Sequence, residues 1–371
     1  MKTNSIKTIT RKIDSITGIL FPNNCHTVQI QLENGQLSPI YVIGDGVVSG
    51  AHARLDGMTL DYMVLNGYIL PLVLCLLSLM GISDERISLC MGLPNGLIPD
   101  VSRRSSIEGQ MTHFLIGPHT YIFDGQKKKL LINDISFTVQ GFAALCSKLL
   151  DTQGEFAALS TEKLDAPMTV LDIGYSSSDL LNINNKEHKN ENEFVVWKKL
   201  PGIKDLCCSI HDGMSRIFGK TYFTPEDLLP FLLGEKDIEL ENPYSYESDK
   251  YSGSWIKRLF KSKVTPTSSG VLPAKNGGVD IAGFSKKRWT AETAKMLESY
   301  NTKKSGLIFI TGGGAILLHD EIRDLFPEGE FLPDPIYAAA LGCNHLGAAR
   351  HQTNVVGIDL GSYYVKGALN A

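Results

Sequence analysis

Residues 355–367 read VVGIDLGSYYVKG and combine a carboxylate, a glycine turn and a lysine. An apolar strand delivers Asp359 to its end, and Gly361 and Ser362 form the turn that follows. Lys366 then lies on the returning strand. Phosphate oxygens require converging N–H donors and a cation, and Mg²⁺ requires carboxylates that keep its water shell in place. The segment predicts a phosphate site, although an ordinary hairpin with an aspartate in its turn has the same pattern.

Residues 170–179 read VLDIGYSSSD and repeat that pattern in another part of the chain. A buried strand leads to Asp172, and Gly174 opens a turn of small or hydroxylated residues that contains Tyr175, Ser176 and Ser177. Alone, this second segment is weak evidence for a phosphate site. Two such hairpins in one chain are stronger evidence, because two facing hairpins can hold a polyphosphate from both sides.

Residues 307–315 read LIFITGGGA, so a third apolar strand runs into Gly312, Gly313 and Gly314. Successive glycines allow the backbone to approach a flat group such as adenine closely, although a tight strand-to-helix turn requires the same residues. The run is not the G-x-G-x-x-G of dinucleotide-binding folds, and the sequence contains no G-x-x-x-x-G-K-[ST]. Rossmann dehydrogenases and P-loop enzymes are therefore poor matches.

The elements that must position these turns predict an α/β protein. The 371 residues, 43% of them hydrophobic, suffice for two domains. An Asn-Gly pair between two β-rich runs predicts a hairpin. The apolar run 68–81 is shorter than the about 20 residues of a membrane-spanning helix and predicts a buried helix. The expected strands and helices are a hairpin over 27–32 and 40–44, a helix over 57–80, a strand over 87–94, strands around a basic turn at 127–129, and helices over 139–150, 203–218 and 335–350.

Charge and cysteine content narrow the class of protein further. A formal net charge of −4 does not indicate a nucleic-acid-binding surface over the whole molecule. The seven cysteines contain no C-x-x-C pair, and the first residues lack a signal-peptide core, so we expect a cytoplasmic protein without membrane segments. Residues 239–278 read as a surface insertion. The basic and aromatic runs 255–263 and 286–289 suit a solvated face, with contacts to DNA, an adaptor or a second copy as the alternative.

Together, the three turns resemble the phosphate-1, phosphate-2 and adenosine motifs of the actin, heat-shock-chaperone and sugar-kinase ATPase superfamily. Residues 358–367 are most similar to bacterial and archaeal actin-like proteins of the ParM type. The resemblance implies two duplicated ribonuclease H-like domains, with residues 1–150 plus 336–371 in domain I and 151–335 in domain II. In those proteins the phosphate-1 hairpin precedes the other two motifs, whereas here it follows them. This order predicts a circular permutation, with both ends of the chain in domain I and residues 351–354 as the candidate join.

The resemblance also assigns roles to individual residues. It implies that Asp359 and Asp172 hold Mg²⁺ and its waters, that Lys366 reaches the β-phosphate, and that Gln140 orients the attacking water. Gln140 is neutral and cannot act as a strong base, and a glutamine on a helix surface often has no role. The residues expected around the phosphates and the nucleoside are Gly361, Ser362, Tyr363, Tyr364, Gly174, Tyr175, Ser176, Ser177, Gly312, Gly313 and Gly314.

The resemblance implies an ATPase that binds Mg-ATP or GTP, hydrolyses it slowly and couples hydrolysis to assembly of filaments. Plasmid or DNA segregation is the expected role, with a DNA-binding adaptor protein as a partner and no direct contact to nucleic acid. Two alternatives stay open on the same fold. One is a small-molecule kinase, for which the sequence offers no convincing catalytic carboxylate or sugar pocket, and the other is a scaffold that binds nucleotide without turnover.

Overall fold

The computed structural model describes most of residues 2–218 and of residues 306–369, with gaps. The described stretches are mainly residues 2–7, 10–13, 25–44, 60–83, 85–157, 166–183, 195–218, 306–351, 354–361 and 364–369. Ser362, Tyr363, the expected insertion over 239–278 and the basic run 255–263 lie outside the described residues.

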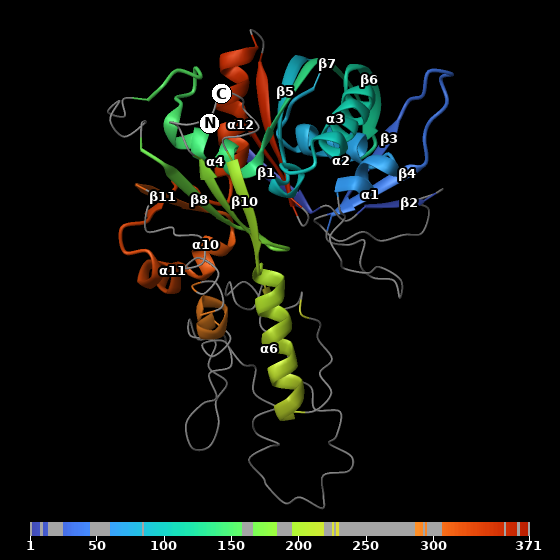
Figure 1. Cartoon of the computed structure of the whole chain (residues 1–371). Helices are drawn as coiled ribbons and strands as arrows, with labels where there is room; N and C mark the ends of the chain where they lie inside the picture. The colour runs from blue at the N-terminus through green and yellow to red at the C-terminus, as the bar shows by residue number, and fades with distance from the viewer. Residues whose placement is uncertain are drawn as a thin grey trace, which may run out of the picture.

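One half of the molecule is a nine-stranded mixed sheet, which contains strands from both the beginning and the end of the chain (Figure 1). Its strand order is β1-β14-β13-β5-β7-β6-β3-β4-β2. Its centre consists of parallel strands, with β13 beside β5 and β5 beside β7. Strands β5 and β13 are nearly continuous apolar runs because helices cover both of their faces. The strands are β1 (Lys2–Lys7), β2 (Thr10–Ile13), β3 (Cys25–Ile30), β4 (Ile40–Gly44), β5 (Arg86–Leu93), β6 (Gly117–Phe123), β7 (Gln126–Val139), β13 (Val355–Leu360) and β14 (Tyr364–Leu369).

A second, five-stranded sheet in the order β10-β9-β8-β11-β12 is built from the other described region. Its antiparallel strands β8 and β9 form the hairpin of the second aspartate motif, and β11 runs parallel to β8. The bounds are β8 (Met168–Ile173), β9 (Ser178–Ile183), β10 (Val195–Leu200), β11 (Leu307–Thr311) and β12 (Glu330–Phe331).

Helices cover both sheets and divide the interior into three apolar clusters. The first cluster packs α1 (Leu60–Leu65), α2 (Ile69–Leu79) and α3 (Val101–Leu115) on one face of the nine-stranded sheet. The second packs α6 (Ile203–Phe218), α10 (Gly314–Leu317) and α11 (His319–Leu325) against the smaller sheet. The third joins α4 (Gln140–Leu149) and α12 (Ala338–Arg350) to strands of both sheets, so these two helices connect the halves.

Strand β1 continues the hairpin formed by β13 and β14. It pairs antiparallel with β14, from Lys2 opposite Leu369 to Lys7 opposite Tyr364. The first and last described strands are thus neighbours at one edge of the sheet (Figure 1). Strand β2 lies at the opposite edge of the same sheet, yet only two residues separate it from β1. Since three residue steps span about 11 Å at most, the sheet must curl until its edges approach.

Several predicted elements are confirmed, among them the Asn-Gly hairpin, where Gly35 has a φ of +82° and Val28 pairs with Tyr41. Three predictions were wrong in detail. The helix expected over 57–80 is broken by Gly67, whose φ of +66° ends α1 before α2 begins. The turn expected at 127–129 lies at Asp124 and Gly125, both at positive φ, so the lysines are on β7. The helix expected from residue 335 begins at Ala338.

Within the described residues, no helix combines the length and the apolarity that a membrane crossing requires. The apolar run 68–81 forms α2, as expected, and its residues from Leu72 to Leu77 are fully buried under the nine-stranded sheet.

The crossing of α4 and α12 depends on a glycine. A Cβ atom built at Gly342 would overlap the backbone carbonyl of Ala143 in α4. We expect Gly342→Ala to lower the free energy of unfolding by about 3 kcal/mol, because neither backbone can move without disturbing both sheets. The matched control is Gly109→Ala on the exposed face of α3, where nothing lies within 4 Å of the new methyl group. That change should stabilise the protein by about 0.5–1 kcal/mol. Urea unfolding of both variants measures the difference, and equal effects would contradict the packing described.

Candidate functional site

The centre of the candidate site is the β13–β14 hairpin. Asp359 is the penultimate residue of the fully buried strand β13, and Lys366 is its direct cross-strand partner on β14. Their side chains form an ion pair with 2.8 Å between Lys366 Nζ and Asp359 Oδ2, and only 18% and 5% of the two side chains are exposed. Burial alone would lower the pKa of Lys366. The charge and hydrogen bond of Asp359, with the charge of Asp172, nevertheless raise this pKa, so the lysine stays a cation.

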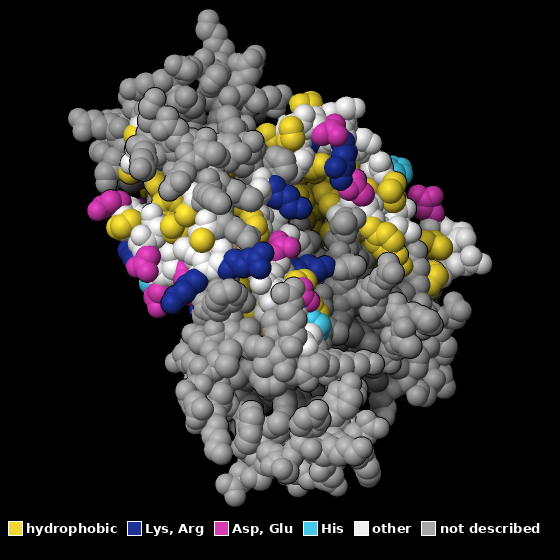
Figure 2. All heavy atoms as spheres, turned by 60° about the horizontal axis from the view of Figure 1, so that its bottom comes forward, with side chains coloured by type: hydrophobic (Ala, Val, Ile, Leu, Met, Phe, Trp, Pro, Cys, Tyr) yellow, Lys and Arg dark blue, Asp and Glu magenta, His cyan; other side chains and the backbone are white. Residues whose placement is uncertain are grey.

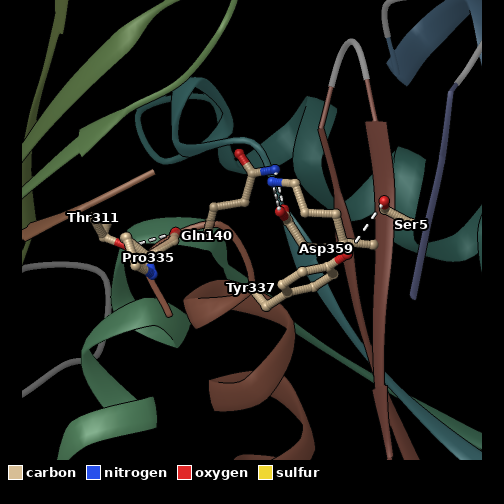
Figure 3. A network of polar contacts seen from close by, with 7 residues as sticks. Ser5, Gln140, Thr311, Pro335, Tyr337 and Asp359 are labelled. Carbon is tan, nitrogen blue, oxygen red and sulfur yellow. Dashed lines mark hydrogen bonds and ion pairs between the residues drawn. The ribbon is translucent and has the colours of Figure 1, made fainter. Parts of the chain in front are cut away.

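Gln140 brings α4 to the same carboxylate. It is the first residue of the helix, and its Nε2 donates a hydrogen bond of 2.6 Å to Asp359 Oδ1. Figure 3 shows the glutamine and the aspartate reaching toward one another across the site, with the amide oxygen of Gln140 directed away from Asp359. Gly92, at the end of β5, lies beside them, and a Cβ there would be 3.6 Å from Gln140 Cγ and 3.2 Å from Cys343 Sγ.

Asp172 contributes a second carboxylate from the smaller sheet. It lies near the end of β8, partly buried, and pairs across the hairpin with Asp179 of β9, which is 8% exposed. Burial, together with the negative charges of Asp179 and Asp359, raises the pKa of Asp172 to about 7, while the positive charge of Lys366 opposes this shift. The mutual influence of Asp172, Asp359 and Lys366 places the two aspartate hairpins in one electrostatic environment.

The turn between β8 and β9 is held by the start of α6. The Gly174 N–H donates to Ser177 O at 2.9 Å and closes the turn. The Lys204 N–H, in the first turn of α6, donates to Tyr175 O at 2.8 Å. Gly202 precedes the helix, and a Cβ there would be 2.6 Å from Ser177 N and 2.7 Å from Ser176 C. The expected phosphate-2 turn is therefore fixed by backbone contacts, and the Tyr175 ring packs on the second apolar cluster.

The three glycines after β11 have different environments. Gly312 has a φ of +89°, and a Cβ there would lie 2.6 Å from Asp172 Oδ1, so the glycine allows β11 to approach the Asp172 carboxylate. Gly314 packs against Ile173 in the same way. Gly313 is exposed, with nothing within 4 Å of the position of a Cβ. This open backbone suits a flat group placed against it.

The segment before α12 completes the surroundings of the site. Pro335 O accepts hydrogen bonds from the Gly312 N–H at 3.0 Å and from Thr311 Oγ1 at 3.2 Å, which ties this segment to the glycines. Tyr337, two residues later, donates from its hydroxyl to Ser5 Oγ at 3.4 Å, and its ring lies beside the Asp359 group in Figure 3. Sequence reasoning did not identify Tyr337, because an aromatic residue before a helix carries no distinctive signal.

The structure brings together the side chains of Asp359, Lys366 and Gln140, places Asp172 where the charges of Asp359 and Lys366 act on it, and places Gly312 against Asp172. Gly361 lies at the start of the β13–β14 turn, partly buried beside the backbone of Tyr364, the first residue of β14. Sequence reasoning also missed two further residues of the site region. One is Asp179, which closes the quoted motif, and the other is Asn95, whose buried position no local pattern indicates.

The donor set suits a magnesium–nucleotide better than a metal held by protein alone. In the part of the chain that the structure describes, no three or more His, Cys, Asp or Glu side chains gather as a metal site. Mg²⁺ is typically held by one or two carboxylates together with phosphate oxygens and water. Asp172 and Asp359 provide two carboxylates, and Lys366 and the open backbone at Gly313 suit phosphate and base. The residues present therefore fit this group.

Comparisons with solved structures find matches over nearly the whole chain. The actin-like protein Alp7A covers 93% of this chain and 90% of its own, with a TM-score of 0.61 and 13% identity. ParM of Bacillus thuringiensis with AMPPNP covers 94% and 92%, with a TM-score of 0.59 and 14% identity. The archaeal actin homologue Ta0583 covers 94% and 98%, with a TM-score of 0.57 and 16% identity. No family model matches the sequence, and no curated protein matches it.

The raised pKa of Asp172 predicts a pH-dependent stability of the metal-free protein. An aspartate whose pKa is about 7 in the folded state and 3.8 in the unfolded chain binds its proton more tightly when folded. The free energy of unfolding therefore falls as pH rises between these values, and the full loss is present above pH 7. Asp172→Asn removes this loss. We expect the variant to exceed wild type by about 1–2 kcal/mol at pH 8 and by little at pH 4, because partial exposure reduces the about 1.4 kcal/mol per pKa unit.

Thermal unfolding in a chelating buffer at the two pH values measures this difference. Asp324→Asn, on the exposed side of α11, is the control and should change the unfolding temperature little at either pH. A variant at position 172 that is less stable than wild type at pH 8, or a gap that does not grow with pH, would contradict the electrostatic environment described.

Proposed function

We propose that this chain, which has the actin-like fold, binds a magnesium–nucleoside triphosphate between its two sheets and hydrolyses it slowly. The fold is shown by the similarity to ParM-type and archaeal actin-like structures, as the resemblance of its motifs predicted. At 13–16% identity this similarity does not carry activity, so the proposal depends on the site. The nucleotide is ATP or GTP. The observation that carries the proposal is the meeting of Asp359, Lys366 and Gln140 beside Asp172.

Lys366 would hold the phosphates. An ammonium has three N–H donors, and the ion pair with Asp359 uses one of them. The other donors can reach oxygens of a bound phosphate, and the positive charge lies where negative charge develops on the leaving group. The raised pKa keeps this charge in place over the physiological range.

Gln140 would orient the attacking water. Its NH₂ group is committed to Asp359, so its amide oxygen is the atom left to accept a hydrogen bond from water. Since an amide is not a base, this residue contributes orientation and not proton abstraction. Asp359 and Asp172 would hold the metal, which supplies charge neutralisation to the phosphates when bound.

The assembly and partners of the protein are part of the same proposal. Among the similar solved structures is one described as an Alp12 filament, with a TM-score of 0.53. We propose that this protein also self-associates with nucleotide and that it acts in the cytoplasm in plasmid or DNA segregation through a DNA-binding adaptor. On the face shown in Figure 2, basic and acidic side chains are interspersed among the described residues, so these residues do not form the basic patch that direct DNA binding would require.

The order of the motifs is best explained by a circular permutation. The β13–β14 hairpin follows the other motifs in the chain, yet it lies inside the nine-stranded sheet between β5 and β1. Without the permutation, β13 and β14 would be followed directly in the chain by β1. The antiparallel pairing of β14 with β1 supports this order. The division into domains at residues 150 and 336 remains a prediction of the same proposal.

The proposal predicts nucleotide hydrolysis that depends on Gln140. We expect phosphate release from ATP or GTP with Mg²⁺, and we expect Gln140→Ala to lower kcat about 100-fold because the water loses its orienting acceptor. Gln110→Ala, in α3 and bonded there to Ser106, is the matched control and should hydrolyse as wild type does. Light scattering and pelleting with each nucleotide measure assembly on the same samples.

The outcomes separate the alternatives. Nucleotide-dependent pelleting without phosphate release would replace the ATPase with a scaffold. Turnover that appears only with an added sugar would favour a kinase. A protein that neither releases phosphate nor pellets with either nucleotide would contradict the proposal.

A further inference from the structure

Asn95 is a buried amide that connects two elements of the site region. It begins the short 3₁₀ turn η2 (Asn95–Leu97) just after β5, and it is 0% exposed. Its Oδ1 accepts a hydrogen bond of 2.9 Å from the Gly141 N–H, and its Nδ2 donates one of 3.2 Å to Asp179 Oδ2. A fully buried amide with both ends engaged has one orientation, since reversing it would place donor against donor and acceptor against acceptor.

One end of this amide caps the helix that carries Gln140. The first N–H groups of a helix lack partners within it and are usually satisfied by a polar side chain at the N-cap. The N-cap of α4 is Val139, which makes no side-chain hydrogen bond. Asn95 thus provides, from another element, the acceptor that the local sequence lacks. Since Gly141 follows Gln140 directly, this bond fixes the backbone on which Gln140 stands.

The other end reaches the hairpin of the second sheet. Asp179 is the cross-strand partner of Asp172, so both carboxylates are on the same face of the hairpin. The start of α4 also packs closely on this hairpin, since a Cβ at Gly141 would be 2.7 Å from Leu181 Cδ1. Asn95 therefore links an element that follows the nine-stranded sheet to an element of the five-stranded sheet.

We propose that Asn95, held by Asp179, is the positioning residue that sets Gln140 relative to the two aspartate hairpins. The inference rests on the proposed hydrolysis, in which Gln140 orients water. Asn95 acts through the backbone of α4 and touches none of the reacting groups. Its amide is the link through which the position of the β8–β9 hairpin is transmitted to the start of α4.

The first test measures the Gly141 amide itself, in protein without nucleotide. Asn95→Ala removes the acceptor, and we expect hydrogen exchange at the start of α4 to accelerate at least about tenfold relative to wild type. Asn34→Ala, in the exposed hairpin turn, is the control and should leave exchange at α4 unchanged. Unchanged protection of Gly141 in Asn95→Ala would overturn the capping bond, whether or not the protein hydrolyses nucleotide.

The second test is a double-mutant cycle on kcat. If Asn95 acts through Gln140, Asn95→Ala lowers kcat about 10- to 100-fold in the wild-type background, and the same change in Gln140→Ala has almost no further effect. An equal fold loss in both backgrounds would show that Asn95 acts independently and would overturn the proposal. Absence of turnover in wild type would defeat the proposed hydrolysis instead, and the exchange measurement would still judge the link.

If Asn95→Ala does not fold, exchanging the amide of Asn95 and the carboxylate of Asp179 tests the proposal instead. Asn95→Asp retains the acceptor for Gly141 but sets a carboxylate against Asp179, so we expect a loss of kcat with little change in exchange at Gly141. Adding Asp179→Asn restores one donor and one acceptor in the opposite sense, and most of the lost kcat should return. A double variant no better than Asn95→Asp alone would overturn the role of Asp179.

Discussion

The arrangement of the site depends on one buried ion pair, between Asp359 and Lys366. Placing two charges among apolar strands costs free energy that their attraction offsets only when the geometry is good and the remaining polar atoms are satisfied. Direct cross-strand pairing provides the geometry, and Gln140 satisfies the second carboxylate oxygen. Removing any partner would leave an uncompensated charge or acceptor in the interior. This constraint holds the β13–β14 hairpin and the start of α4 in one place.

A second constraint, the close packing of α4 against α12, fixes the position of the two sheets relative to one another. Small residues on α12 let the two helices approach until Gly342 meets the backbone of α4. Because both helices also contribute to the apolar cluster shared by the sheets, a change at their crossing reaches each hairpin. Asn95 adds hydrogen bonds to Gly141 and Asp179 at the edge of this packing. The candidate site is thus built where three close contacts converge, and its precision follows from them.

Local sequence patterns predicted those parts of the fold that local physics decides. The apolar strands β5, β8, β11 and β13, the buried helix α2 and the turn at Gly35 each carry a period or a turn residue that indicates them. The actin-like fold was predicted from the combination of three strand–glycine turns. The break between α1 and α2 lies at Asn66-Gly67, and Asn-Gly is a turn signal that the prediction of one continuous helix overlooked because the run is apolar on both sides.

Only part of the site was predicted, because only some of its residues stand in local sequence motifs. Asp359, Asp172 and Lys366 stand in motifs, and the structure places them in one electrostatic environment. Asn95 and Tyr337 stand in none, because their importance comes from partners far away in the chain: Asp179 and Gly141 for the first, Ser5 for the second. No reading of neighbouring residues can supply such contacts.

Binding of nucleotide to the purified protein tests the central claim most directly. Calorimetric titration of ATP or GTP in the presence of Mg²⁺ should give one site per chain, with binding weakened at least about 100-fold in Lys366→Met, which loses the cation that the phosphates need. Equal affinity of wild type and Lys366→Met, or no binding of either nucleotide to folded wild-type protein, would contradict the account.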